Sequence, residues 1–280
     1  MLTEKKAIIA GGGRGIGKAI AKAFVGAGAE VLLVARNKTD LEAAQKELSP
    51  LGRVEVISAD VSLETDSAAV AQKAYDLWGR LDILVNAAGV YGPIGPLAEA
   101  NVAEWRKAID INLFGTFLMM RATVPLMKKS GRGKIVNFSG GGEGAYANFA
   151  AYAASKGAVV RLTETAAEEL KSFNIEVNAI APGAVNTKLL DDLLKAGPEK
   201  AGEETYKRSL EQKASGGVPP EKAAELAVFL ASDAANGISG RIISAIRDDY
   251  RNFPSRLKEI MESDIYTWRR IKPQDRGYNW

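Results

Sequence analysis

Short apolar segments alternate with longer segments of helical apolar spacing along most of this 280-residue chain. The short segments are continuously apolar, which is typical of strands covered on both faces of a parallel sheet. This order predicts an α/β fold, a doubly wound parallel sheet of about seven strands with helices on both faces. We expect strands at Lys6–Ala10, Glu30–Ala35, Val54–Ser58, Ile83–Asn86, Lys134–Phe138, Glu176–Ile180 and Arg241–Ala245, and helices at Ile16–Ala27, Thr39–Leu48, Leu63–Trp78, Asn101–Lys129, Tyr152–Phe173 and Glu221–Leu230.

We expect a single domain at residues 1–246, followed by a C-terminal extension that is not a separate domain. Two segments interrupt the alternation of strands and helices. Residues 187–218 hold six basic and six acidic side chains, and they predict a substrate lid, with a plain surface insertion as the alternative. Residues 247–280 contain six of the 20 aromatic residues, whereas disordered segments are poor in aromatics. We expect this extension to pack across a subunit contact or beside the substrate cleft; covering apolar area at the sheet edge is the alternative.

The composition excludes several kinds of catalytic site. The chain has no histidine and no cysteine, so it has no Ser-His-Asp triad, no thiolate nucleophile and no His-containing zinc site. We therefore expect no metal, and catalysis by Tyr, Lys, Asp, Glu, Ser or a cofactor. The net charge of +3 comes from the last 40 residues, with nine basic and six acidic side chains, too small a surplus for a nucleic-acid protein.

The chain shows neither an export signal nor an apolar run of the roughly 18 residues that a membrane span needs. We expect a cytoplasmic protein with no membrane partner.

A glycine-rich turn follows the first predicted strand, as Ala10-Gly11-Gly12-Gly13-Arg14-Gly15-Ile16-Gly17, and a helix follows the turn. Glycines here permit a sharp turn, close approach of a pyrophosphate to the backbone, and tight packing of the helix. The helix N-terminus adds free N–H groups and a partial positive charge. The turn and the strand that follows it predict dinucleotide binding.

The end of the second predicted strand bears on the choice of dinucleotide. An NAD-specific site usually places a carboxylate here to bind the ribose 2′-hydroxyl, but the chain has Ala35 followed by Arg36. Arg36, with Arg14, could instead meet a 2′-phosphate. We expect a preference for NADP(H), with NAD(H) possible; an exposed arginine that binds no ligand is the alternative.

Tyr152 and Lys156 lie at i and i+4 on a predicted helix, and hence on one face. An ammonium group beside a phenol stabilises the phenolate and lowers its pKa toward the range useful in acid–base catalysis. Tyr146 has no such partner, because Ala150 stands four residues later.

These motifs, in this order, resemble those of the classical short-chain dehydrogenase/reductase family, a family of Rossmann-type oxidoreductases. The resemblance covers about residues 3–245 and includes the glycine turn, Asn86-Ala87-Ala88-Gly89, Asn112, Ser139 and Tyr152…Lys156. It extends to Pro182-Gly183-Ala184-Val185-Asn186-Thr187 and to Asp60-Val61. Ala10 and Ala87 depart from the usual family residues, and the long C-terminal extension departs most.

The resemblance implies hydride transfer between a nicotinamide and a small carbonyl or alcohol substrate. Tyr152 would be the general acid and base, Lys156 would lower its pKa and bind the ribose, and Ser139 would hold the substrate oxygen. Asn112 would hold a proton-relaying water. The implied catalytic residues are Asn112, Ser139, Tyr152 and Lys156, and the cofactor-binding residues are Gly11, Arg14, Gly15, Ile16, Gly17, Arg36, Asp60, Val61, Asn86, Ala87, Gly89, Tyr152, Lys156, Pro182, Gly183, Val185 and Thr187.

Other interpretations stay open. Ser139 could be only a strand-end cap, Asn112 a helix contact and Asn86 a structural amide. The chain could be an epimerase or dehydratase of nucleotide sugars, or an NADP sensor without catalysis. The family likeness also implies a homodimer or homotetramer with the helices 101–129 and 152–173 at its interface. The glycine-rich segment after Ser139 is expected to face the cleft, where Glu143 could bind a hydroxyl group or a cation of the substrate.

Overall fold

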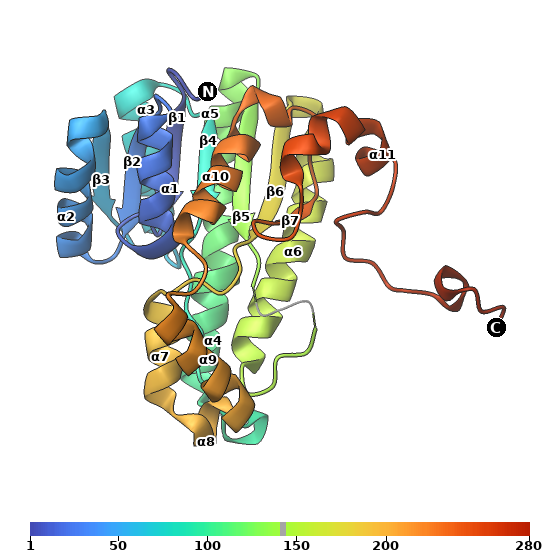
Figure 1. Ribbon diagram of the computed structural model, residues 1–280. Helices are drawn as coiled ribbons and strands as arrows, with labels where there is room; N and C mark the ends of the chain where they lie inside the picture. Colours follow the sequence, from blue (N-terminus) through green and yellow to red (C-terminus); the bar gives the residue numbers. More distant parts are fainter. Residues whose placement is uncertain (141–143) are drawn as a thin grey trace.

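The computed structural model describes residues 1–140 and 144–280 and contains a parallel seven-stranded sheet in the order β3-β2-β1-β4-β5-β6-β7. Helices cover both faces of the sheet (Figure 1), so the predicted doubly wound architecture is confirmed. The first four strands have the predicted bounds, and the other three differ by one residue at one or both ends. The strands are β1 (Lys6–Ala10), β2 (Glu30–Ala35), β3 (Val54–Ser58), β4 (Ile83–Asn86), β5 (Gly133–Phe138), β6 (Ile175–Ala181) and β7 (Ile242–Ser244).

The sheet separates two apolar core layers, each of which is covered by helices. Alternate strand residues such as Ile9 and Val31 pack toward α1 (Gly15–Gly26), α2 (Lys38–Leu48) and α10 (Pro220–Ala231). Their neighbours Ile8 and Leu32 pack toward the other layer, because successive strand side chains point to opposite faces. That other layer contains α3 (Glu64–Trp78), α5 (Gly115–Ser130) and α6 (Ala150–Leu170).

The predicted single helix at Asn101–Lys129 is wrong in one respect. The structure has α4 (Val102–Ile109), a π-helical turn at Asp110–Phe114 and then α5. A π-turn inserts an extra residue and re-aims the side chains around it. Here it brings Asn112 inward, fully buried, a tertiary effect that a periodic pattern does not record. The second long helix, predicted at Tyr152–Phe173, is α6 followed by a 3-10 turn at Lys171–Phe173.

Residues 187–218 form three helices at the end of the molecule where the strands terminate (Figure 1). They are α7 (Lys188–Ala196), α8 (Pro198–Ala201) and α9 (Glu203–Ser215). The segment returns to the body through bridges from Val185 to Gly217 and Val218. The start and the end of the expected lid are therefore joined at one place.

The first part of the C-terminal extension covers apolar area. A 3-10 helix at Tyr250–Arg256 and α11 (Leu257–Met261) bury Tyr250, Phe253 and Ile260 in the same core layer as α10. This part fits the alternative considered for the extension. Beyond it, the chain passes α6 and its last residues leave the body (Figure 1).

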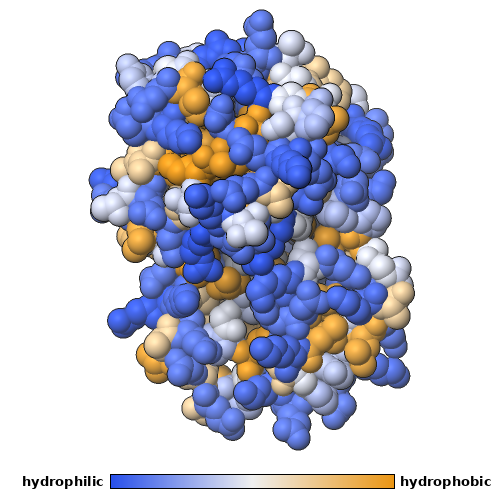
Figure 2. Space-filling model, turned by 90° about the vertical axis from the view of Figure 1, so that its left-hand side faces the viewer, coloured by the Kyte–Doolittle hydropathy of each residue, from blue (hydrophilic) through white to orange (hydrophobic). Residues whose placement is uncertain are grey.

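The surface seen in Figure 2 is mostly hydrophilic, with separate small apolar areas. Within the described ranges, 1–140 and 144–280, the structure contains no helix with the length and apolar character that a membrane span requires.

The side chain of Arg241 binds the backbone of the C-terminal extension, and replacing it tests how the extension is anchored. Its buried guanidinium donates hydrogen bonds to the carbonyl oxygens of Ile260 at 2.7 Å and Ser263 at 3.1 Å. We expect Arg241→Met to lower the free energy of unfolding by about 2–4 kcal/mol, since it strands buried acceptors of charge-assisted bonds. Urea denaturation measures this. Arg256→Met, which breaks only an exposed ion pair with Glu259, serves as control and should cost less than about 1 kcal/mol. Equal losses in the two variants would contradict the anchoring role.

Candidate active site

A cavity of about 520 Å³ lies at the carboxyl ends of β4, β5, β6 and β7. Ser139, Tyr152 and Lys156 all line it, which places three of the four predicted catalytic residues at one site. Predicted cofactor residues line it as well: Ile16, Ala87, Gly89, Pro182, Gly183, Val185 and Thr187.

Lys156 joins helix α6 to the end of strand β5. Its Nζ donates a hydrogen bond to the carbonyl oxygen of Phe138 at 2.8 Å, and the residue is only 5% exposed. Burial penalises the ammonium form and lowers the pKa of Lys156 to about 8. The amine can therefore change its charge close to physiological pH.

Tyr152 places its hydroxyl against the backbone of Gly140. A Cβ at Gly140 would lie 2.2 Å from that oxygen, so glycine is required there. Burial, followed by the nearby Tyr146, raises the pKa of Tyr152, which is opposite to the expected lowering by Lys156. The reason is geometric, because the Lys156 ammonium is turned toward Phe138 and lies 6.0 Å from the centre of the Tyr152 ring.

Ser139 directly follows β5 and is mostly buried. Its Oγ donates to the carbonyl oxygen of Ile180 at 3.3 Å, a long bond that a hydroxyl can exchange for another acceptor by rotation. The side chain can thus serve both as the strand-end contact considered above and as a donor into the cavity.

Asn112 stands behind the cavity, not in its wall. The Nδ2 group donates to the carbonyl oxygen of Val90 at 2.8 Å and to Ser155 Oγ at 2.9 Å, and Oδ1 accepts from the Val90 N–H at 2.8 Å. Ser155 in turn donates to the carbonyl oxygen of Tyr152 at 2.8 Å. These bonds use both amide donors and one acceptor site, so Asn112 positions the first turn of α6 and keeps one lone pair for the expected water.

The glycine turn forms the expected cradle before α1. Gly11 has φ +82°, and a Cβ at Gly17 would lie 2.2 Å from the carbonyl oxygen of Gly11. Side chains at these positions would collide with backbone, at Ala88 for Gly11 and at Gly11 for Gly17, so these glycines let the turn and the first turn of α1 pack closely enough to expose the helix N-terminus to a pyrophosphate. Gly15 faces Thr187, since a Cβ there would lie 3.4 Å from the threonine methyl group. The turn and the segment 182–187 thus lie across from each other.

Asn86 does not reach the cavity. Its Nδ2 donates to Asn137 Oδ1 at 2.9 Å, within the sheet between β4 and β5. This arrangement matches the structural-amide alternative, although Asn86 Oδ1 is buried and has no hydrogen-bond partner among the residues that the structure describes.

The residues expected near the adenosine end lie at the ends of β2 and β3, outside the main cavity. Arg36 is half-exposed and lies 3.6 Å from the carboxylate of Asp60, and Arg14 lies 3.6 Å from that of Asp40. Burial alone would raise the pKa of Asp60, but hydrogen bonds from Ser62 and the Arg36 charge hold it below its usual value. Val61 packs against Gly115 of α5, where a Cβ would lie 2.8 Å from the valine.

Sequence reasoning missed the aromatic wall of the cavity. Tyr91 packs edge-on against Tyr152 with ring centres 4.8 Å apart, and Tyr146 stacks on Phe149 at 4.2 Å. Neither pair has a signal in the local pattern. Other parts of the missed wall come from the expected lid, from the last residue of the domain and from the extension: Leu189, Leu190, Leu193, Ser209, Gln212, Ile246, Arg247 and Trp268. Glu143 lies outside the described residues.

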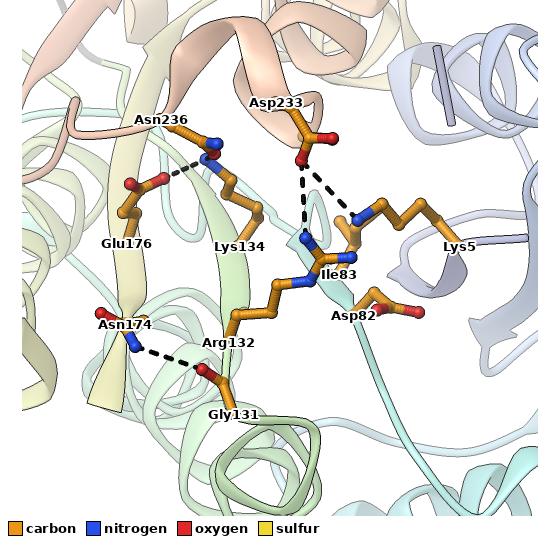
Figure 3. A pocket seen from close by; sticks show the side chains of 12 residues that line it. Lys5, Asp82, Ile83, Gly131, Arg132, Lys134, Asn174, Glu176, Asp233 and Asn236 are labelled. Carbon is orange, nitrogen blue, oxygen red and sulfur yellow. Dashed lines mark hydrogen bonds and ion pairs between the residues drawn. The ribbon is translucent and has the colours of Figure 1, made fainter. Parts of the chain in front are cut away.

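A second cavity, of about 350 Å³, lies at the opposite end of the sheet, where β1, β4, β5 and β6 begin. Figure 3 shows the residues that line it. Its charges compensate one another, because Asp233 lies 3.8 Å from both Lys5 and Arg132 while Lys134 pairs with Glu176. It contains none of the predicted catalytic residues.

Comparisons with known proteins agree with this geometry. Residues 5–197 match the family described as short chain dehydrogenase. The chain is 34% identical to levodione reductase of Leifsonia aquatica, over 86% of this chain and 92% of that protein. It is 36% identical to 7alpha-hydroxysteroid dehydrogenase of Escherichia coli, over 87% and 93%.

Solved structures show the same likeness. The crystal structure of levodione reductase superposes with a TM-score of 0.80 at 30% identity, covering 91% of this chain and 99% of the other. That of NAD+-bound xylitol dehydrogenase gives 0.77 at 26% identity, covering 87% and 98%. The chain belongs to the short-chain dehydrogenase family, and it is an oxidoreductase of the nicotinamide-dependent kind.

Proposed function

We propose that this protein transfers hydride between NADP(H) and a ketone or secondary alcohol. The observation that carries this proposal is the convergence of Ser139, Tyr152 and Lys156 on one cavity that also contains Gly89 and Thr187. The bound nicotinamide would supply the hydride. The glycine turn would hold its pyrophosphate, Lys156 its ribose and the segment 182–187 its carboxamide.

The chain's own residues manage the proton and the substrate oxygen. Because burial raises the pKa of Tyr152, its phenol is protonated at neutral pH and can donate to the carbonyl oxygen during reduction. Ser139 Oγ donates a second hydrogen bond to that oxygen and stabilises the charge that develops on it. Lys156, whose ammonium is held by Phe138 at 6.0 Å from the centre of the Tyr152 ring, would supply the positive charge that favours the phenolate as the proton leaves, and Asn112 would relay protons through a bound water.

The proposed acid is tested by Tyr152→Phe, which removes only the hydroxyl. We expect kcat for ketone reduction to fall by at least about 10³, the range typical of a lost general acid, while NADPH still binds. NADPH absorbance measures turnover and protein fluorescence measures binding. Tyr146→Phe removes a nearby hydroxyl that has no such role and should have a much smaller effect. Near-normal turnover by Tyr152→Phe would refute the assignment.

Three features of the β2 end support the preference for NADP(H). Ala35 offers no carboxylate to a ribose 2′-hydroxyl, and Arg36 and Arg14 each extend a half-exposed guanidinium group from this region. Arginine binds phosphate through two parallel hydrogen bonds. The partners of these arginines, Asp60 and Asp40, would keep their positions while the guanidinium groups turn to the ligand.

Arg36→Asp tests this preference. We expect it to lower kcat/KM with NADPH by about tenfold or more, the loss of one charge-assisted contact, and to affect NADH less. Arg53→Asp makes the same charge change at a similarly exposed arginine, which lies directly before β3 at the amino end of that strand. It should leave the ratio of kcat/KM with NADPH to kcat/KM with NADH unchanged. Equal or better kcat/KM of the unaltered protein with NADH would contradict the proposal, as would an Arg36→Asp variant that keeps its NADP preference.

Two other functions are less well supported. An epimerase or dehydratase of nucleotide sugars would convert its substrate without net change in NADPH absorbance, whereas a reductase consumes NADPH. A sensor without catalysis would not need Ser139, Tyr152 and Lys156 around one cavity. The relatives named above are a reductase and a dehydrogenase.

We also propose a cytoplasmic homodimer or homotetramer that uses the outer face of the π-helical turn and of α5, which follows it. Phe114 and Phe117 are 46% and 39% exposed, and their rings lie 5.7 Å apart, so an apolar pair is left on this surface. We expect Phe114→Asp with Phe117→Asp to reduce the assembly to monomers, measured by light scattering at several concentrations. The pair Leu51→Asp and Leu63→Asp introduces the same charges at other exposed sites as control. An unchanged mass in the phenylalanine variant would contradict this interface.

A further inference from the structure

A tryptophan from the C-terminal extension reaches the proposed active site. Trp268 lines the cavity that contains Ser139, Tyr152 and Lys156, although it lies beyond the part of the chain that resembles the family. The residue is 43% exposed, so one part of it packs on the protein and another faces open space.

Two side chains of helix α6 bind the backbone N–H and carbonyl groups of Trp268. The N–H group of Trp268 donates to Glu164 Oε1 at 2.7 Å, and its carbonyl oxygen accepts from Arg161 Nη2 at 2.5 Å. Arg161 and Glu164 are themselves paired at 2.6 Å. Because α6 also carries Tyr152 and Lys156, the tryptophan is positioned relative to the catalytic residues by the helix that presents them.

Gly157 leaves room for the indole. A Cβ at this position would lie 3.2 Å from Cζ3 of Trp268 and 3.7 Å from Cη2. Gly157 directly follows Lys156, so the ring lies beside the helical turn that carries the lysine. Any larger residue at position 157 would push the ring away from α6.

The sheet fixes the path of the extension just before Trp268. The Ile242 N–H donates to the carbonyl oxygen of Tyr266 at 2.8 Å, and Arg241 binds the carbonyl oxygens of Ile260 and Ser263. These contacts order the chain up to two residues before the tryptophan. The indole is therefore not carried by a loose tail.

The remaining substrate-side walls are mainly apolar and aromatic. They include Tyr91, Tyr146, Leu189, Leu190, Leu193 and Ile246. The polar groups Ser209 and Gln212 come from α9, and Arg247 adds one charged side chain. Flat, rigid side chains bury a ring at a low entropic cost, because neither partner loses many rotamers.

We propose that Trp268 is a specificity-determining residue, which selects substrates whose reacting carbon belongs to an apolar ring. This inference rests on the function proposed above. The indole forms part of the cavity wall beside Gly157, and Arg161 and Glu164 are its positioning residues.

Kinetics with two ketones test the proposal on the full chain. With NADPH as donor, we expect Trp268→Ala to raise KM for cyclohexanone about three- to tenfold, the value of one aromatic contact, while KM for acetone changes little. Trp268→Phe should keep most of the discrimination, and Arg161→Ala with Glu164→Ala should lose part of it. Trp280→Ala, at a residue of the same extension that is 82% exposed, is the matched control.

The outcomes separate the two proposals. If the unaltered protein reduces both ketones but Trp268→Ala leaves the ratio of their kcat/KM values unchanged, the role of Trp268 is overturned and the proposed function stands. If the unaltered protein oxidises NADPH with neither ketone, the proposed function fails. Calorimetric titration with cyclohexanone then decides the role of Trp268. Weaker binding to Trp268→Ala supports it, and equal binding, or no binding to the unaltered protein, overturns it.

Discussion

The candidate active site depends on one buried hydrogen bond, from Lys156 Nζ to the carbonyl oxygen of Phe138. An ammonium group removed from water needs a partner at close range, and here the partner is the last carbonyl of a central strand. The bond ties α6 to the carboxyl end of β5, so that Tyr152 on the helix and Ser139 after the strand share one cavity. The π-turn serves the same end, because Asn112 binds Ser155 from behind and holds the first turn of α6.

Burial shifts the pKa values of the two proposed catalytic groups in opposite directions. It raises the pKa of Tyr152 and lowers that of Lys156 to about 8, since a low-dielectric site disfavours phenolate and ammonium alike. Without a ligand, the Tyr152 phenol is therefore in its protonated form at neutral pH. Oxidation of an alcohol needs the phenolate, and a positive charge near the phenol is what would stabilise it.

The C-terminal extension has two roles along its length. Tyr250, Phe253 and Ile260 complete the core beside α10, and Arg241 binds the carbonyl oxygens that follow them. Only after this anchorage does the chain reach α6, where Trp268 joins the wall of the cavity. The first part of the extension thus covers apolar area and a later part lies beside the cavity, while its packing across a subunit contact stays a prediction.

The sequence by itself determined the order of the β and α elements along the chain, the bounds of β1–β4, the glycine turn and the spacing of Tyr152 and Lys156. These features depend on local periodicity and on neighbours within one turn. Only the tertiary structure decided where side chains distant in sequence meet. It placed the π-turn in the middle of the helix predicted at Asn101–Lys129, directed Asn86 to Asn137, paired Arg36 with Asp60 and brought Trp268 to the cavity. Each of these arises from packing between segments far apart along the chain, which a local pattern does not encode.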